Sequence, residues 1–388
     1  MTELDAVVVG SGPAGSAAAA HLARAGARVA IVEQSHHPRP KPCAEYASPR
    51  IVEELARLGL EAERWTDDAV PLDGMELHAG GRVAHIRYAD RSRRRTAWGV
   101  DRRRFDALLA RHAGSCGAEL REGTRAIELV EETGRVRGVR TRDADGTTLT
   151  LRAGIVIGAD GARSTVARLA GVERKVGYPR RLGLVAHYTA VDGLTDHGEM
   201  HVGDGYYVGL APTPGELNVG MALPLGGRGS AEARFEDALA GLPEVAGRLR
   251  GSARLGPIRG AAPIGHRVRT TGGPGWLLVG DAAGFVDPFT GEGIHRALRS
   301  ARAAATAILA GGDVPAAYRA ERRRAFAAKS TLTWMIQGFL AAPPLLEHAV
   351  ARLALRPAVA LRLGSALGDC RPATDALSPR ALFEVLGP

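Results

Sequence analysis

The stretch "DAVVVGSGPAGSAAAAHLARAGARVAIVE", residues 5–33, decides the fold of this chain. Its two apolar runs flank a glycine-rich turn and a run of small residues, which predicts a strand, a helix and a strand within about 30 residues. Gly10, Gly12 and Gly15 allow a tight turn, close backbone approach to a pyrophosphate and close helix packing. Glu33 ends the second strand, where a carboxylate can bind a ribose hydroxyl. The unit therefore predicts a Rossmann-type dinucleotide site, with NAD and FAD as alternatives; further predicted contacts are Pro13, Ala14 and Gln34.

A second motif, "GWLLVGDAAGFVDPFTGEGIHRAL" (residues 275–298), favours FAD. Asp281 follows Gly280 at the carboxyl end of a predicted buried strand, where an acid can bind a ribityl hydroxyl. A helix is predicted to begin near Gly291, soon after Pro288. Free amides at a helix start stabilise negative charge on the pyrimidine end of a reduced flavin, so Gly293 and Ile294 are also predicted cofactor contacts.

A third motif, "VIGADGARSTVARLAG" (residues 156–171), completes a pattern that extends over nearly the whole chain. In this order the three motifs resemble the FAD-dependent oxidoreductases that include para-hydroxybenzoate-hydroxylase-type aromatic monooxygenases and geranylgeranyl reductases. The resemblance implies an α/β fold: a Rossmann-type, glutathione-reductase-like FAD-binding domain, an inserted antiparallel β-sheet substrate domain, and C-terminal helices. It also implies that Arg102 contacts the pyrophosphate and that the backbone at Ala126 flanks the adenine. Asp160 either contacts the cofactor or fixes a turn at the seam between the domains.

The order of strand-like and helix-like segments predicts a discontinuous domain arrangement. The FAD-binding domain is expected at residues 1–70, 98–178 and 263–325, and the substrate-binding sheet at residues 71–97 and 179–262. Residues 326–388 are expected to form a C-terminal helical segment. An interrupted domain of this kind places a cleft where the two domains meet.

The loop "KPCAEYASPR", residues 41–50, resembles a Lys-Pro-Cys loop of the geranylgeranyl reductases that lies beside the flavin. Lys41, Pro42 and Cys43 match it and are predicted to contact the cofactor. Residues 44–46 differ, because Ala, Glu and Tyr replace the usual glycines, and Val208 replaces a tryptophan of the reductases' sheet motif. These differences predict an altered wall facing the substrate. The Cys43 thiol is interpreted either as a reactive group or as a small side chain packed against the flavin ring.

The leading functional interpretation is an FAD-dependent monooxygenase acting on an apolar aromatic, phenolic or polyketide-like molecule of secondary metabolism, with NAD(P)H as a transient co-substrate. The alternatives are a geranylgeranyl-reductase-type ene-reductase and a non-catalytic flavoprotein bound at a membrane surface. A halogenase is disfavoured, because no Trp-x-Trp-x-x-Pro segment occurs. Candidate catalytic residues are Cys43, Tyr46 and His295, the last either near the substrate or merely packed in its helix; candidate substrate contacts are His187, Tyr206, Tyr207 and Val208.

Composition excludes several other classes of function. The net charge of +9 comes almost entirely from scattered arginines without interleaved aromatic residues, so nucleic-acid binding is not expected, whereas weak contact with an anionic membrane surface is an open alternative. Three cysteines and no leader-like segment before Leu4 predict a protein of the reducing cytoplasm. Contact with an anionic membrane surface would make it membrane-peripheral, which is the alternative location. No metal site is expected, because His197 and His201 lie four residues apart in strand-like rather than helical sequence.

Overall fold

A mostly parallel sheet forms the centre of the larger domain. The computed structural model describes residues 3–91 and 93–387. In this sheet the strand order is β10-β2-β1-β13-β12-β11, and β22 pairs with both β13 and β21. The strands are β1 (Leu4–Val9), β2 (Val29–Val32), β10 (Glu119–Arg121), β11 (Arg125–Glu132), β12 (Arg135–Arg142), β13 (Thr148–Gly158), β21 (Gly272–Gly273) and β22 (Trp276–Leu278). Strands β10, β2, β1, β13 and β22 are parallel, so their carboxyl ends lie along one edge.

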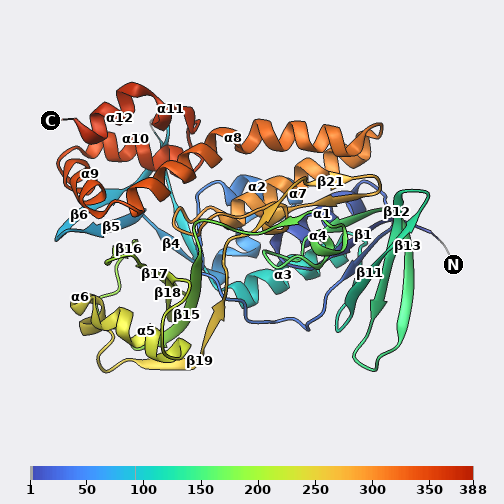
Figure 1. The fold of residues 1–388 in the computed structure, drawn as a ribbon, viewed down its shortest axis with the longest axis horizontal. Helices are drawn as coiled ribbons and strands as arrows, with labels where there is room; N and C mark the ends of the chain where they lie inside the picture. The colour runs from blue at the N-terminus through green and yellow to red at the C-terminus, as the bar shows by residue number, and fades with distance from the viewer. Residues whose placement is uncertain (1–2, 92, 388) are drawn as a thin grey trace.

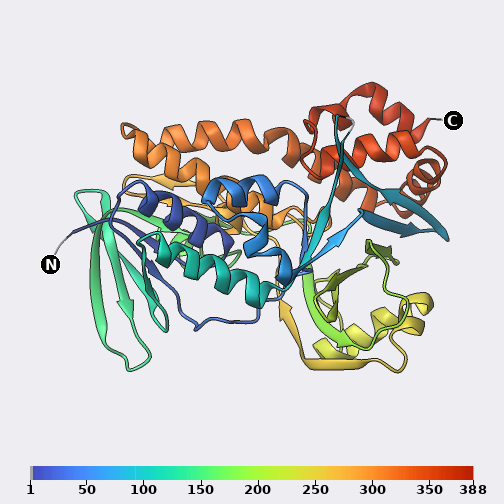
Figure 2. The same cartoon turned by 180° about the vertical axis from the view of Figure 1, so that it is seen from behind.

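Three helices cover one face of this sheet: α1 (Pro13–Arg24), α3 (Arg102–Ser115) and α7 (Gly293–Ala310) (Figures 1 and 2). The small side chains of α1 explain the tight packing, because Ala17, Ala18 and Ala20 are buried almost completely against the strands and the neighbouring helices. The opposite face carries a separate apolar cluster that includes Val139, Val166 and Leu278.

The second sheet is almost entirely antiparallel, in the order β19-β15-β18-β17-β16-β5-β6. Its strands are β5 (Met75–Ala79), β6 (Arg82–Ile86), β15 (Arg181–Thr189), β16 (Gly198–Val202), β17 (Tyr207–Thr213), β18 (Glu216–Pro224) and β19 (Ala253–Ala261). The hairpin β5–β6 joins it through a parallel pairing of β5 with β16. Residues 75–86 and 181–261 therefore meet in one sheet although almost 100 residues separate them in sequence.

The central strands β16, β17 and β18 of this sheet are buried on both faces, whereas β19 at its edge is largely exposed. Helices α5 (Ala231–Ala240) and α6 (Pro243–Arg248) cover one face, where Val208 and Leu210 pack against Phe235. On the other face, Met200 and Tyr207 belong to a cluster with the C-terminal helices. Successive residues of a strand point to opposite faces, so neighbours in β17 serve different cores.

The C-terminal helices lie beside the hairpin β5–β6, except for the long first one, which extends along α7 of the larger domain (Figure 1). They are α8 (Val314–Leu340), α9 (Pro343–Leu355), α10 (Pro357–Leu367), α11 (Thr374–Leu377) and α12 (Pro379–Leu386). Among the described residues, none of the helices combines the length and the apolar character needed to cross a bilayer.

Shorter elements complete the described chain. They are β3 (Tyr46–Ala47), β4 (Ala69–Leu72) and β9 (Ala97–Val100) in one small sheet, β7 (Tyr88–Asp90) with β8 (Arg93–Arg95), β14 (Glu173–Arg174) with β20 (Arg267–Val268), the helices α2 (Ile51–Leu58) and α4 (Thr165–Leu169), and the 3-10 turns η1 (Ala62–Arg64), η2 (Thr66–Asp68) and η3 (Gly280–Ala283).

Candidate active site

A cavity of about 830 Å³ lies between the two sheets. Its walls include the carboxyl ends of β1 and β2, the loop before β3, the start of α7, and inward-facing residues of β15, β16, β17 and β18. Every predicted cofactor contact lines it except Gly15 and Gly280, which pack directly behind the wall. Three motifs that are far apart in sequence thus meet in one cavity.

The nucleotide end of the cavity depends on glycine. Gly10 has a positive φ of 99°, and a Cβ there would lie 2.6 Å from the Ala159 carbonyl oxygen. A Cβ on Gly15 would lie only 1.8 Å from the Gly10 carbonyl oxygen. Helix α1 begins after Gly12, and none of the side chains described caps its first amides. These amides and the helix dipole favour a bound pyrophosphate.

Glu33 lies at the end of β2, beside this helix start. Its carboxylate accepts hydrogen bonds from the Ser11 amide at 3.0 Å and the Ser11 hydroxyl at 2.8 Å, and pairs with Arg39 at 3.4 Å. Burial opposes ionisation, but Arg39 and the Ser11 hydrogen bonds outweigh it and lower the pKa of Glu33. An ionised, fixed carboxylate at this place suits a ribose hydroxyl.

The other end of the cavity contains the start of α7. Gly291 has a φ of 64°, and α7 begins at Gly293 with no capping side chain among the described residues. Beside Gly10, at the nucleotide end, burial raises the pKa of Asp160, whose Oδ2 accepts from the Val166 amide while its Oδ1 has no described hydrogen-bond partner. A buried acceptor of this kind and two uncapped helix starts fit a long cofactor with a central pyrophosphate.

Arg102 has a role that the sequence did not predict. Its guanidinium binds both carboxylate oxygens of Asp106, at 2.7 and 2.9 Å, and donates to the Cys43 sulfur at 3.2 Å. Burial opposes the charge, but Asp106 and Cys43 together raise the pKa of Arg102 above its usual value. Arg39, which the sequence analysis missed, lies nearer the uncapped start of α1: its Nη2 is 3.7 Å from a Cβ position on Gly12.

Glu45 organises the loop that carries Cys43. Its φ of 56° is a left-handed conformation that glycine adopts easily, which explains why glycines suit this loop in the reductases it resembles. The buried carboxylate accepts from the Arg102 amide at 3.1 Å and from Asn218 Nδ2 at 3.1 Å, and pairs with His187 Nε2 at 2.9 Å. Asn218 also donates to the Cys43 carbonyl oxygen at 2.9 Å. The loop is therefore held by partners from three distant segments.

The His187–Glu45 pair predicts a pH-dependent stability. Burial opposes the imidazolium, but the hydrogen bond that its Nε2 donates to Glu45 raises the pKa of His187 above its ordinary value near 6.5. This stabilisation is fully present below pH 6.5 and is lost as the pH rises through the raised pKa. His187→Gln is therefore expected to lower the free energy of unfolding by about 1 kcal/mol at pH 6. Denaturant titrations should show the difference from wild type shrinking at pH 9; a constant difference would contradict the charged pair.

Among the predicted substrate contacts, Tyr207 lines the cavity, whereas Tyr206 and Val208 do not. Tyr206 donates to the Ala238 carbonyl oxygen at 2.9 Å, and Val208 is completely buried in the core under α5. The prediction that both face the substrate is corrected, because alternate side chains of β17 point away from the cavity. His187 does not line the cavity either; it pairs with Glu45, which does.

The two tyrosines in the wall have engaged hydroxyl groups. Tyr46 and Tyr88 share a hydrogen bond of 2.8 Å, and the Tyr207 hydroxyl donates to Asp287 at 2.7 Å. Burial raises the pKa of both Tyr46 and Tyr207 well above the ordinary value. These side chains therefore present ring edges and faces, rather than free hydroxyls, to a bound molecule.

His295 does not line the cavity, unlike its neighbour Ile294. It faces the C-terminal segment, where its Nδ1 lies 3.0 Å from Asp369, and Lys329 bridges Asp369 and Glu292 at 3.1 Å each. The prediction that His295 is catalytic or faces substrate is thus corrected, because one helical step turns a side chain by about 100°.

His295→Asn is expected to lower the free energy of unfolding by about 1 to 2 kcal/mol, because Asp369 loses an ionic partner. Turnover should stay within about twofold of wild type, because the residue lies outside the cavity. Thermal unfolding and steady-state kinetics measure the two effects. A large loss of turnover with unchanged stability would restore a catalytic role for His295.

Comparison with known proteins agrees with this geometry. Residues 3–328 match the family model described as an FAD binding domain. The menaquinone reductase of Mycolicibacterium smegmatis is 33% identical over 324 residues, which cover 80% of this chain and 78% of that protein. The digeranylgeranylglycerophospholipid reductase of Methanosarcina acetivorans is 31% identical over 330 residues, covering 80% and 77%.

Solved structures show the same fold. A geranylgeranyl bacteriochlorophyll reductase-like protein from Thermoplasma acidophilum superimposes with a TM-score of 0.83 at 23% identity, covering 99% of this chain and 97% of that one. The myxobacterial chondrochloren halogenase superimposes with a TM-score of 0.75 at 26% identity, covering 83% and 79%. Proteins with different named activities thus share this architecture.

Proposed function

Because the chain belongs to the FAD-binding-domain family of flavin-dependent oxidoreductases, we propose that it reduces a carbon–carbon double bond in a hydrophobic, isoprenoid-type molecule. The observation that carries the proposal is the Cys43 thiol, which lines the cavity and accepts a hydrogen bond from Arg102. Double-bond reduction needs a hydride for one carbon and a proton for the other. A fixed thiol beside the cofactor provides a proton donor for the second carbon.

In this mechanism Cys43 and the residues that contact its loop have separate roles. FAD, when bound, would supply the hydride, with NAD(P)H as its transient reductant. Cys43 gives its proton to the neighbouring carbon, and the Arg102 guanidinium at 3.2 Å stabilises the thiolate that remains. Glu45 and Asn218 are positioning residues, because Asn218 binds the Cys43 carbonyl oxygen and Glu45, and Glu45 in turn binds the Arg102 amide. The Cys43 thiolate regains its proton from solvent before the next turnover.

The apolar wall of the cavity supports a hydrophobic substrate. Its sheet side is lined by Val185, Met200, Met221, Ile264 and Phe285. Contacts of this kind favour burial of hydrocarbon and exclude water from the site of proton transfer. A menaquinone reductase at 33% identity and a digeranylgeranylglycerophospholipid reductase at 31% are similar to this chain, and these names support the same substrate class.

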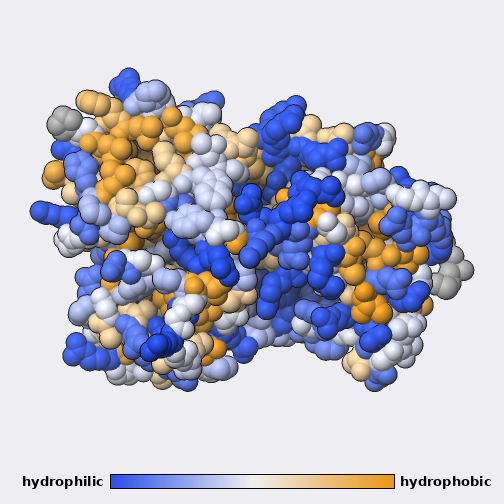
Figure 3. Space-filling view, in the orientation of Figure 1, coloured by the Kyte–Doolittle hydropathy of each residue, from blue (hydrophilic) through white to orange (hydrophobic). Residues whose placement is uncertain are grey.

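The outer surface of the C-terminal helices adds support for a lipid-borne substrate. Leu345, Leu355 and Phe383 are exposed there, Leu355 by 76% and Phe383 by 66%. Figure 3 shows hydrophobic side chains gathered over this part of the molecule. Exposed apolar area on these helices suits contact with a membrane surface that holds the substrate.

The monooxygenase interpretation stays a prediction with weaker support. It relied on tyrosines to orient a phenol, but the hydroxyls of Tyr46 and Tyr207 already bind Tyr88 and Asp287, and Tyr206 faces away. Reduction of a double bond in a hydrocarbon chain does not need free tyrosine hydroxyls to orient the substrate.

The test is an anaerobic reaction of the FAD-loaded protein with NADPH and either a polyprenyl quinone or a geranylgeranyl lipid. A gain of two hydrogens in product mass, without oxygen, supports the proposal. Product that forms only with oxygen and gains one oxygen atom would establish the monooxygenase instead. If neither product forms while NADPH still reduces the bound FAD, the proposed isoprenoid substrate class is wrong.

A further inference from the structure

A cluster of histidine and glutamate side chains lies on the second sheet, on the face opposite Met200 and the flavin cavity. Strand pairing produces it: Glu76 of β5 lies opposite His85 of β6 and opposite Glu199 of β16, and His78 lies opposite His201. His197 directly precedes β16. His197 and His201 alone, in one strand-like segment, do not form a ligand pair. The strand register, however, brings residues from β5, β6 and the segment before β16 together.

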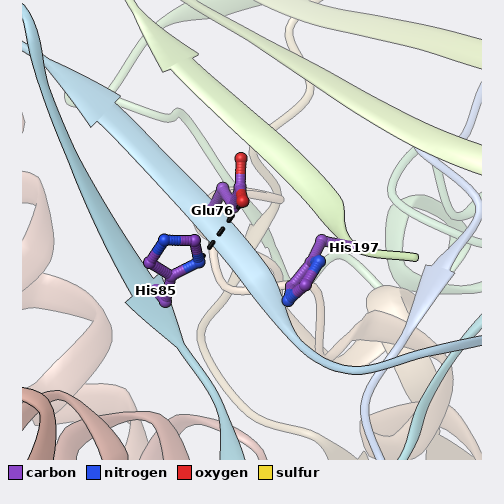
Figure 4. Close-up of side chains that lie close together, drawn as sticks. All are labelled: Glu76, His85 and His197. Carbon is purple, nitrogen blue, oxygen red and sulfur yellow. Dashed lines mark ion pairs between the residues drawn. The ribbon is translucent and has the colours of Figure 1, made fainter. Parts of the chain in front are cut away.

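Glu76, His85 and His197 form one group within this cluster. Each offers a ligand atom, and the three atoms lie within 4.8 Å of one another. Glu76 Oε1 is 3.3 Å from His85 Nδ1, and Figure 4 shows these two side chains and His197 projecting from neighbouring segments toward a common space. In a tetrahedral zinc site, bonds of about 2.0–2.1 Å separate the ligand atoms by about 3.3 Å. Small side-chain rotations close the remaining gap.

His197 has the arrangement of a prepared metal ligand. Its Nδ1 lies 2.6 Å from Asp196 Oδ1, so a proton on Nδ1 is shared with this carboxylate. Its Nε2 is buried and finds no hydrogen-bond partner in the part of the chain that the structure describes. A carboxylate that holds one ring nitrogen leaves the lone pair of the other nitrogen directed at the ion. Asp73 Oδ2, which Arg87 and Arg94 bind, lies 3.9 Å from this Nε2, beyond hydrogen-bond distance. An unpaired buried nitrogen is otherwise unfavourable.

In the neighbouring group of His78, Glu199 and His201, the atoms of Glu199 and His201 that could bind a metal are already engaged. Arg248 binds both oxygens of Glu199, at 2.7 and 2.6 Å, and His201 lies between Glu199 at 2.9 Å and Glu244 at 3.0 Å. The guanidinium repels a cation, and the polar atoms of His201 and Glu199 already have partners. This second group is a satisfied ionic network, and it leaves the first group as the candidate site.

We propose that Glu76, His85 and His197 bind a divalent transition metal ion of the zinc class, with Asp196 orienting His197. Two imidazoles and one carboxylate are a ligand set that zinc favours. The His85 side chain is 51% exposed, which gives the ion access and leaves a coordination position for water. The ion would link β5, β6 and β16, and β16 carries Met200 into the cavity wall on its opposite face.

The experiment is a titration of the chelator-treated, FAD-loaded protein with Zn²⁺ by calorimetry and with Co²⁺ by visible absorption. We expect one ion per chain and a Co²⁺ spectrum of low coordination number. His85→Ala should weaken binding more than about 100-fold, and Asp196→Asn about tenfold, the range expected for loss of an orienting carboxylate. His348→Ala, in α9 and far in sequence from the cluster, should bind as wild type does.

Because the His85 side chain is half exposed, its removal should leave the fold intact. Retained FAD absorbance of the variant checks that it has folded. Zn²⁺ should also raise the melting temperature of wild type and leave that of His85→Ala unchanged. Equal binding by wild type, His85→Ala and His197→Ala, or no stoichiometric binding to wild type, would overturn the proposal.

Discussion

Gly15→Ala is expected to abolish FAD binding. A Cβ at this position would lie 1.8 Å from the Gly10 carbonyl oxygen and 3.1 Å from the Ala159 side chain, so α1 cannot keep its place against the turn. Moving α1 also moves the amides that follow Gly12, which are the proposed pyrophosphate site. We expect purified protein without flavin absorbance and a stability loss above about 4 kcal/mol, the exceptional end of single substitutions.

Gly114→Ala is the matched control for this substitution. Gly114 lies in α3, and a Cβ there would meet nothing within 4 Å. The control should keep FAD and gain up to about 1 kcal/mol, because alanine favours a helix over glycine. If Gly15→Ala retains stoichiometric FAD, the close contact between α1 and the turn is not required for the cofactor site.

Cys43→Ser is expected to lower double-bond reduction by about 10²- to 10⁴-fold while FAD stays bound. The serine hydroxyl fits the space of the thiol and still accepts from Arg102, but it is a much weaker acid. The half-reaction in which NADPH reduces the flavin should proceed at the wild-type rate, because it needs no proton from the thiol. Stopped-flow absorbance separates this step from turnover.

Cys116→Ser provides the control for the cysteine substitution. Cys116 follows α3, outside the cavity, and its sulfur lies 3.6 Å from His112. This variant should retain full turnover. Full turnover by Cys43→Ser as well would show that the thiol only fills space beside the cofactor, and the proton would then have to come from another group.

The cofactor half of the site was largely predictable, because its signals are local. Gly10, Gly12 and Glu33 fall within one strand–helix–strand unit, and the start of α7 follows one further motif, so spacing along the chain defines the geometry. The comparisons confirm FAD as the cofactor and confirm the predicted fold class.

The substrate half was less predictable, because the central strands of the second sheet are buried on both faces. The segment that contains Tyr206, Tyr207 and Val208 is apolar or aromatic throughout, so no alternation in polarity reveals which residues face the cavity. Glu45 was recognised only as a departure from a glycine pattern. Its partners His187 and Asn218 lie more than 140 residues away, and no local signal connects them.

The division of β17 between two compartments has a consequence for how such proteins diversify. Tyr207 and Gly209 border the cavity, whereas Val208 and Leu210 anchor the strand under α5. A methyl group on Gly209 would meet the Met200 side chain at an ordinary 3.5 Å. Substitutions at the cavity-facing positions of β17 can therefore change which substrate fits, while the positions between them keep the strand packed under α5.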